Sequence, residues 1–249
     1  MKARFYTLLF LFIPALSFGQ KTEMMLTLES GLFSFRGHSA ESTSFLNVYN
    51  RGSSYEGYTN NAFGSKSGIS QGGSFQIQRI NKRKLFAGIG IGFENLLSKI
   101  DLLDVYVSTP VTGGSTVIHT GANPNLPVIG HTYLSNRFVT LNPYIGFRFP
   151  TEFGVAIDFQ AGFDAGYLLS ARENGRAELS NGTVYTTSTD RKYISLDIRP
   201  RLQATLHYRK IGLFAGYSHG LVNYKEGWIG GINEAYSKYL RFGAQYRLR

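Results

Sequence analysis

An unusually long alternation of apolar and polar residues constrains this chain more than any other feature. From residue 153 to residue 169 every odd-numbered position is apolar, while the even positions are mostly small or polar, Asp158 and Asp164 among them. A second alternation runs from residue 193 to residue 208. Side chains that alternate in this way lie on opposite faces of a β-strand. Both runs exceed the usual strand length of about five or six residues, and they match tilted strands that cross a bilayer and continue beyond it.

The same alternation predicts eight strands across the chain, at 23–35, 68–80, 85–97, 137–149, 153–169, 193–208, 211–222 and 235–248. Their connections alternate in length. Short turns at 81–84, 150–152 and 209–210 fall at one end of the sheet, and long polar segments near 36–67, 98–136, 170–192 and 223–234 fall at the other. An even number of antiparallel strands with this loop asymmetry is typical of outer-membrane β-barrels.

A soluble, lipocalin-like barrel is the alternative fold, and it would place the apolar faces inside. Eight strands enclose a space just wide enough for side chains or one small ligand. The apolar faces, drawn from a chain with 19 Phe and 16 Tyr, carry too much bulk for that space, whereas the opposite faces carry small residues such as Gly88, Gly90 and Gly92. The sequence therefore predicts an all-β fold, an eight-stranded antiparallel up-and-down transmembrane β-barrel with short periplasmic turns and long outer loops.

The N-terminal residues have the pattern of an export signal. A short basic start is followed by an apolar run at 5–16, and Ser17 and Gly19 are small residues suited to cleavage before Gln20. The run is shorter than the about 20 residues that a membrane-spanning helix needs. We therefore expect a signal peptide at 1–19, an outer-membrane barrel domain at 20–249, and localisation in a bacterial outer membrane.

Composition narrows the chemistry. The chain has no cysteine, which excludes disulfides, thiolate metal sites and a cysteine nucleophile. Its formal net charge is +10, but the basic clusters at 82–84 and 209–210 fall in the short turns. There they solvate the turns or face anionic lipid headgroups, so outer-membrane lipid is an expected partner and nucleic acid is not.

The polar faces predict a charged barrel interior. Five acids and five arginines share these faces, and buried charges need partners. The interior is therefore expected to neutralise itself and to leave no solute path, with a narrow channel as the alternative. The predicted lumen charge network consists of Glu29, Glu94, Arg148, Asp158, Asp164, Asp197, Arg199, Arg201, Arg241 and Arg247.

The outer loops are the expected site of partner contacts, because the barrel wall faces lipid and the lumen faces itself. The first loop combines aromatic and small polar residues; it is either a contact surface or a flexible loop. Its contact candidates are Phe45, Tyr49, Tyr55, Tyr58 and Phe63. Segments 105–107 with 116–118, and 184–186 after Asn181-Gly182, are expected to extend the barrel as hairpins whose edges could pair with a protein partner. The periplasmic turns are a second candidate surface for a protein partner.

Catalytic and metal sites are weakly indicated. A lipid-modifying hydrolase or acyltransferase would need a serine, a histidine and an acid, and Ser218-His219 near Glu226 is the candidate. Adjacent strand residues point to opposite faces, so this pair is not expected to act together. His38, His119 and His131 lie in predicted loops without closely spaced ligands. We therefore expect no enzyme activity, no metal and no cofactor.

Several segments together resemble a known family. They are the signal end at 18–20, the LESG opening at 28–31, LFAGIGIGF at 85–93, LNPYIGF at 141–147, GYSHGLVN at 216–223 and LRFGAQYRL at 240–248. In these the chain resembles the PorT-like outer-membrane β-barrel proteins over nearly its whole mature length. The resemblance implies a non-enzymatic eight-stranded barrel that in some members is an accessory to protein secretion or surface assembly. The chain departs from the pattern at its end, where Arg249 stands in place of a closing aromatic residue and Tyr246 is the nearest one.

Overall fold

A closed β-sheet organises the protein. The computed structural model describes residues 21–50, 55–110, 116–120, 127–151 and 154–248, and for 50, 55, 109–110 and 116–120 it describes the backbone. Within these residues the strands are β1 (Lys21–Arg36), β2 (Thr43–Asn50), β3 (Tyr55–Thr59), β4 (Lys66–Ile80), β5 (Leu85–Pro110), β6 (Thr116–Thr120), β7 (Val128–Pro150), β8 (Val155–Leu179), β9 (Val184–Arg191), β10 (Leu196–Tyr208), β11 (Ile211–His219) and β12 (Tyr236–Arg247).

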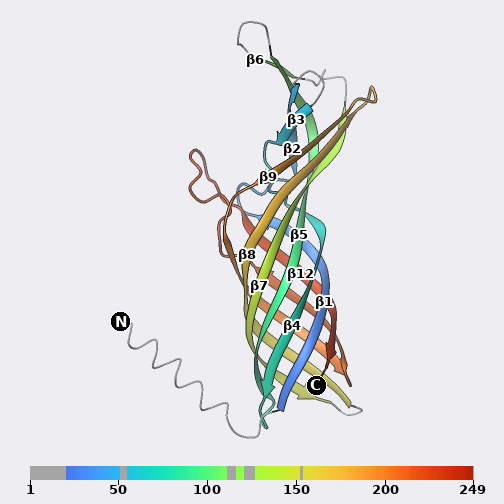
Figure 1. Cartoon of the computed structure of the whole chain (residues 1–249), viewed down its shortest axis with the longest axis vertical. Coiled ribbons are helices and arrows are strands. Elements are labelled where there is room, and N and C mark those ends of the chain that lie inside the picture. Colours follow the sequence, from blue (N-terminus) through green and yellow to red (C-terminus); the bar gives the residue numbers. More distant parts are fainter. Residues whose placement is uncertain (1–20, 51–54, 111–115, 121–126, 152–153, 249) are drawn as a thin grey trace, which may run out of the picture.

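Eight of the described strands form a ring. Strand pairing runs β1, β12, β11, β10, β8, β7, β5 and β4, and β4 pairs again with β1. Every pair in the ring is antiparallel. Each ring strand pairs with the ring strands before and after it in the sequence, and β1 pairs with β12 to close the ring. This is the predicted up-and-down barrel, which Figure 1 shows as the lower cylinder. Closure leaves the ring without an unpaired edge.

Three ring strands are much longer than predicted. β5, β7 and β8 have 26, 23 and 25 residues and continue well above the rest of the barrel. β6 pairs with β5, and β9 pairs with β8, so both expected hairpins are present. The first loop is folded as well: β2 pairs in parallel with β5, and β3 pairs with β2. We call these outer parts of β5, β7 and β8, together with β2, β3, β6 and β9, the outer extension.

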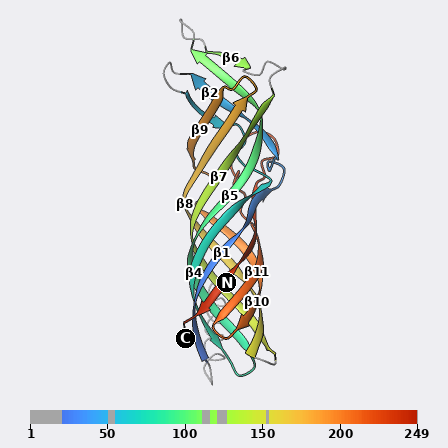
Figure 2. The same cartoon turned by 90° about the vertical axis from the view of Figure 1, so that its right-hand side faces the viewer.

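The opposite end of the barrel is compact. Asn81 opens the turn between β4 and β5, and its side chain accepts a hydrogen bond from the Leu85 amide at 3.0 Å. Lys84 and Arg209 have left-handed φ angles of 66° and 53° in their turns. The start of β1 and the end of β12 lie at this end too, as Figure 2 shows. Both described chain ends therefore meet at the end opposite the outer extension.

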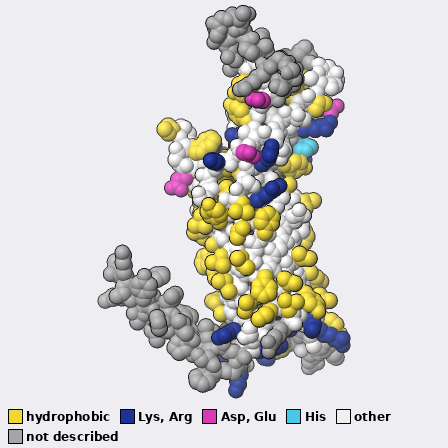
Figure 3. All heavy atoms as spheres, viewed as in Figure 1, with side chains coloured by type: hydrophobic (Ala, Val, Ile, Leu, Met, Phe, Trp, Pro, Cys, Tyr) yellow, Lys and Arg dark blue, Asp and Glu magenta, His cyan; other side chains and the backbone are white. Residues whose placement is uncertain are grey.

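The barrel has an apolar outer surface and a polar interior. A belt of exposed large hydrophobic side chains surrounds it, for example Leu28 (74% exposed), Ile145 (67%) and Leu202 (67%), and Figure 3 shows this belt beneath a zone of charged residues. Inward-facing partners such as Gln76 and Asp164 are buried. A lipocalin-like arrangement would have the opposite polarity, so the fold is a transmembrane β-barrel. No helix in the described residues is long and apolar enough to cross a bilayer.

Candidate functional site

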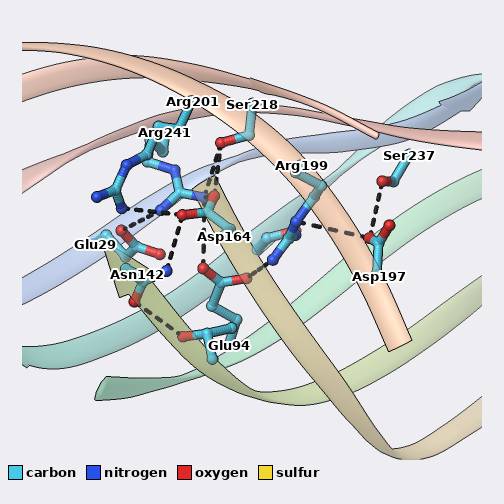
Figure 4. A network of polar contacts seen from close by, with 12 residues as sticks. Glu29, Glu94, Asn142, Asp164, Asp197, Arg199, Arg201, Ser218, Ser237 and Arg241 are labelled. Carbon is cyan, nitrogen blue, oxygen red and sulfur yellow. Dashed lines mark hydrogen bonds and ion pairs between the residues drawn. The ribbon is translucent and has the colours of Figure 1, made fainter. Parts of the chain in front are cut away.

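The centre of the lumen holds one cluster of buried charges, which we call the central cluster. Arg241 on β12 contacts three carboxylates, with N···O distances of 2.5 Å to Asp164, 3.3 Å to Glu29 and 3.4 Å to Glu94. These acids come from β8, β1 and β5, so one guanidinium joins four strands around the ring. Figure 4 shows the side chains converging on the barrel axis. Forked donors suit arginine to this role.

Two further arginines, both on β10, complete the central cluster. Arg199 lies 2.6 Å from Glu94 and 3.6 Å from Asp197, and Arg201 lies 3.1 Å from Asp164. Arg199 is fully buried. Its position two residues from Arg201 places both on the inner face of β10. Charges buried this deeply stabilise only when each has a close partner, which the cluster supplies.

Neutral side chains also donate hydrogen bonds to two of the carboxylates in the central cluster. Asp164 accepts hydrogen bonds from the Asn142 amide and the Ser218 hydroxyl, each at 2.8 Å. Asp197 accepts one from Ser237 at 2.9 Å and one from Tyr224 at 2.8 Å. Tyr224 lies in the connection after β11, and strand alternation carries no signal for a loop residue that folds back into the lumen.

A second cluster lies nearer the short-turn end, and we call it the lower cluster. Arg148 on β7 donates two hydrogen bonds to Glu23 at 3.0 Å and two to Asp158 at 2.7 Å. His207 Nε2 lies 3.0 Å from Asp158. Arg247 lies 3.4 Å from Glu23 and is the most exposed member of the predicted network, with 16% of its side chain accessible. All ten predicted lumen charges thus lie in these two clusters.

Glu23 is the acid that sequence reasoning missed. It is fully buried and bonds to Gln78 as well as Arg148. It shares the odd parity of Thr27 and Glu29 in the predicted first strand, and this alternation is the signal that could have placed it inside the barrel. With Glu23, the described lumen holds six carboxylates and five arginines, and His207 beside Asp158 is the further cationic candidate. The predicted five-to-five balance is therefore wrong by one acid.

An aromatic cluster closes the lumen above the central cluster, and we call it the aromatic plug. Phe35 packs edge-on against Phe33, Phe63 and Tyr224, with ring centroids 5.2, 5.1 and 4.9 Å away. Tyr239 joins from β12, 6.4 Å from Phe33. Phe63 is only 2% exposed. Its predicted role as a surface contact is therefore wrong, because the first loop folds inward and uses this ring to fill the barrel mouth.

An apolar cluster lies in the half of the lumen nearer the short turns. Ile80, Phe86 and Tyr144 form a small buried cluster there. Tyr144 packs across Gly88, where a Cβ atom would come within 2.5 Å of the ring. Gly88 therefore makes room for the ring. Tyr144 also bonds to Gln78 and lies 5.8 Å from Arg201, so it lies between the two charge clusters. Buried side chains thus occupy the lumen from the lower cluster to the aromatic plug, and a pocket of about 300 Å³ at the short-turn end reaches Glu23 and Arg148.

The outer extension has its own apolar core. Leu46 and Val48 of β2 are buried against Leu102 and Val105 of β5 and against Ala177 of β8. β3 is attached through polar contacts: the Thr59 amide donates to Glu173 at 2.7 Å, and Arg191 on β9 donates to Glu173 at 2.9 Å and to the Thr59 carbonyl at 2.8 Å. Burial raises the pKa of the Glu173 carboxyl above its ordinary value.

The other contact candidates of the first loop lie in the extension. Phe45 stacks edge-on against Tyr106 at 4.6 Å. Tyr49 (39% exposed) and Tyr58 have ring centroids 6.2 Å apart. The side chain of Tyr55 lies outside the described residues. This loop is folded in the structure, with Tyr49 open to solvent and Phe45 and Tyr58 half-buried.

The residues considered for catalysis and metal binding are dispersed. Ser218 is buried and bonded to Asp164, whereas His219 bonds to the Tyr217 hydroxyl at 3.2 Å. Tyr217 is exposed at 42%. Serine and histidine therefore lie on opposite faces of β11. Within the described residues no group of three or more potential ligands could hold a metal ion, and the side chain of His119 is outside them. Lys66 holds the pKa of Asp101 below its ordinary value by pairing with it.

Comparisons with known proteins give distant structural likenesses only. No family model and no curated protein matches the chain. One solved structure is that of Ail of Yersinia pestis in complex with the heparin analogue sucrose octasulfate. It is 9% identical to this chain with a TM-score of 0.34, and the alignment covers 92% of this chain and 99% of the Ail chain. Neisserial surface protein A is 9% identical, with coverages of 91% and 98% and a TM-score of 0.35. The monoaromatic hydrocarbon channel TodX, as a deletion mutant, is 10% identical with a TM-score of 0.27. The fold assignment therefore rests on this chain's own strand pairing.

Proposed function

We propose that this protein is a non-enzymatic component of a bacterial outer membrane that acts at the cell surface, in surface display or assembly, with a closed lumen. The observation that carries the proposal is the contrast between a filled barrel and a folded outer extension. The lumen is occupied by ion pairs and by the aromatic plug, which leaves the barrel as an anchor. The extension is the part that is folded and open to partners.

The resemblance to PorT-like proteins adds a more specific role, that of an accessory subunit in protein secretion or surface assembly. An exposed apolar loop tip supports a protein partner. Trp228, Ile229 and Ile232 in the connection between β11 and β12 are 51%, 102% and 63% exposed. Clustered apolar side chains outside the lipid belt mark interaction surfaces.

Affinity isolation tests this role. The tagged protein is extracted from its native outer membrane in mild detergent, and co-purifying proteins are quantified. The expected result is a defined partner in stoichiometric amount that is lost in a Trp228→Ala, Ile229→Ser variant and kept in Leu103→Ser, a matched change at an exposed apolar residue of β5. Isolation of the barrel alone would contradict the accessory role, and absence from the outer-membrane fraction would contradict the localisation.

The alternatives have their own measurements. A small-solute channel would show single-channel conductance in a planar bilayer, and the filled lumen leads us to expect none. A lipid-modifying enzyme would change lipid A acylation when expressed. Since Ser218 faces the lumen and His219 faces outward, we expect no such change.

A further inference from the structure

A cleft in the outer extension is separate from the lumen and from the apolar loop tip. Its volume is about 910 Å³, and it is bordered by the β2–β3 hairpin on one side and by β8 and β9 on the other. The cleft exists because β3 and β9 approach each other through side chains, such as the Thr189 hydroxyl that donates to the Gly57 carbonyl at 2.8 Å. Its lining residues are Tyr49, Glu56, Gly57, Tyr58, Asn174, Gly175, Thr186, Thr187, Ser188, Thr189 and Asp190.

Two glycines allow the strands that border the cleft to approach their neighbours closely. A Cβ atom on Gly57 would lie 2.1 Å from the Asn47 carbonyl oxygen, and one on Gly175 would lie 2.7 Å from the Thr187 hydroxyl. That hydroxyl is buried and has no hydrogen-bond partner among the described residues. The Cβ position of Gly175 also lies 2.8 Å from the buried Thr132 hydroxyl, so the Thr187 hydroxyl faces the interior of the outer extension, and the exposed groups of the lining are the ones available to a ligand.

The lining combines aromatic rings with hydroxyl, amide and carboxylate groups, and within the described part of the chain it contains no aliphatic side chain. The ring planes of Tyr49 and Tyr58 are inclined at 31° to each other. The Arg191 guanidinium packs against the Tyr58 ring, 5.4 Å from its centre. Opposite them, Ser188 donates to the Asn174 side-chain oxygen at 2.8 Å, which orients the amide. We infer that this cleft binds a neutral or amine-bearing glycan, with the tyrosine rings against the C–H faces of its sugar rings and the polar groups on its hydroxyls.

Charge and shape favour this ligand class over others. Among the described residues the lining carries Glu56 and Asp190 and neither lysine nor arginine, which disfavours sulfated or otherwise polyanionic chains. Arg172 borders the cleft but is held by Ser188 at 2.9 Å and lies 3.7 Å from Asp190. An extended peptide that added to the β9 edge would need apolar pockets for alternate side chains, and this lining has none. Glycan binding would give the proposed surface role a ligand. This inference depends on the proposed function in one respect, that the cleft faces the outside of the cell.

Binding is tested on the purified full-length protein in lauryldimethylamine oxide, because a sugar-based detergent would compete for the cleft. The probe is an array of N-acetylglucosamine, glucosamine, mannose and galactose oligosaccharides, with heparin oligosaccharides as polyanions and extended peptides alongside. We expect saturable binding of at least one neutral or amine-bearing glycan. Tyr49→Ala and Asn174→Ala should each weaken it by about tenfold or more, whereas Tyr49→Phe should keep it.

Tyr217→Ala serves as the control, because this exposed tyrosine lies on β11 of the barrel and is absent from the cleft lining. Heat-modifiable mobility in gels shows that the barrel of each variant is folded, and resistance of β2 and β3 to limited proteolysis shows that the outer extension is folded. Binding restricted to heparin or to peptides, binding unaffected by the cleft variants, or no binding to any array member would each overturn the inference. Protease accessibility of the extension on intact cells tests the surface role separately, so the two failures are distinguishable.

Discussion

The barrel and the outer extension are built from the same long strands with opposite polarity. On β8, the inward residues of the barrel are Asp158 and Asp164, whereas those of the extension include Ala177 and Leu179. On β5 the inner face likewise passes from Glu94 to Leu102. The surroundings explain the change. Lipid places the apolar side chains outside and the polar ones inside, and water restores an apolar core as soon as the strands leave the bilayer.

The largest expected effect comes from leaving lumen acids unpaired. Arg241→Leu removes the cation shared by Asp164, Glu29 and Glu94. Breaking a buried ion pair costs about 3–5 kcal/mol, so the barrel should fold poorly and lose its heat-modifiable mobility. Arg199→Leu should act in the same direction. Arg83→Leu, in an exposed turn, should leave mobility unchanged, and normal mobility of Arg241→Leu would show that the network is dispensable.

A mutation in the apolar core of the outer extension should unfold the extension and leave the barrel folded. Leu46→Ala removes a fully buried side chain of the apolar core. Such changes cost about 2–5 kcal/mol, here confined to the extension. Limited proteolysis in lipid vesicles should therefore cut the variant in β2 and β3 while its heat-modifiable mobility persists. Leu103→Ala, at an exposed site, is the control. Simultaneous loss of both signals would show that the two regions unfold as one unit.

A charge placed on the outer surface should lower the free energy of unfolding much more in the barrel than in the outer extension. Leu202 faces outward near the middle of β10, and Val184 is exposed on β9. Leu202→Arg should cost about 2–4 kcal/mol in a bilayer, because the guanidinium enters lipid. Val184→Arg should stay within about 0.5 kcal/mol, since its surroundings are water. Denaturant unfolding in phospholipid vesicles measures both, and equal costs would contradict the membrane position of the belt.

The smallest expected effect is a pH dependence of the extension. Because the pKa of Glu173 is raised on folding, the folded state retains its proton more strongly than the unfolded state. This contribution is complete below the ordinary carboxyl pKa and is lost as pH rises through the raised value. Amide exchange at Gly57 and Thr59, corrected for intrinsic rates, should therefore quicken over that window. Glu173→Gln should remove the dependence, and Glu178→Gln, at an exposed carboxylate, should keep it.

The barrel could be predicted from the sequence because each strand separates lipid from a narrow lumen, so apolar and polar residues alternate along it with a period of two. Sequence reasoning stopped short of the extension for two physical reasons. The β7–β8 pairing shifts register between Arg137 and Phe138, and beyond this bulge the inward residues of β8 change from even to odd numbers. The parallel pairing of β2 with β5 joins segments far apart in the chain, and local alternation carries no information about it. The prediction for Phe63 is wrong because this ring enters the lumen from a loop, and Tyr224 enters in the same way without any signal in the strand alternation.

The junction between β1 and β12 has a consequence for the order of events during biogenesis. These strands come from opposite ends of the chain, and Arg241 reaches Glu29 across 212 residues of sequence. Among the described strands β12 is the last of the ring, so the cylinder is sealed only when β12 has been made and meets β1. Until then Glu29 lacks the arginine it pairs with, while Glu94 and Asp164 have only Arg199 and Arg201. Closure of the ring and completion of the central cluster are thus one event, which gives a chain cut short before β12 no stable place in the membrane.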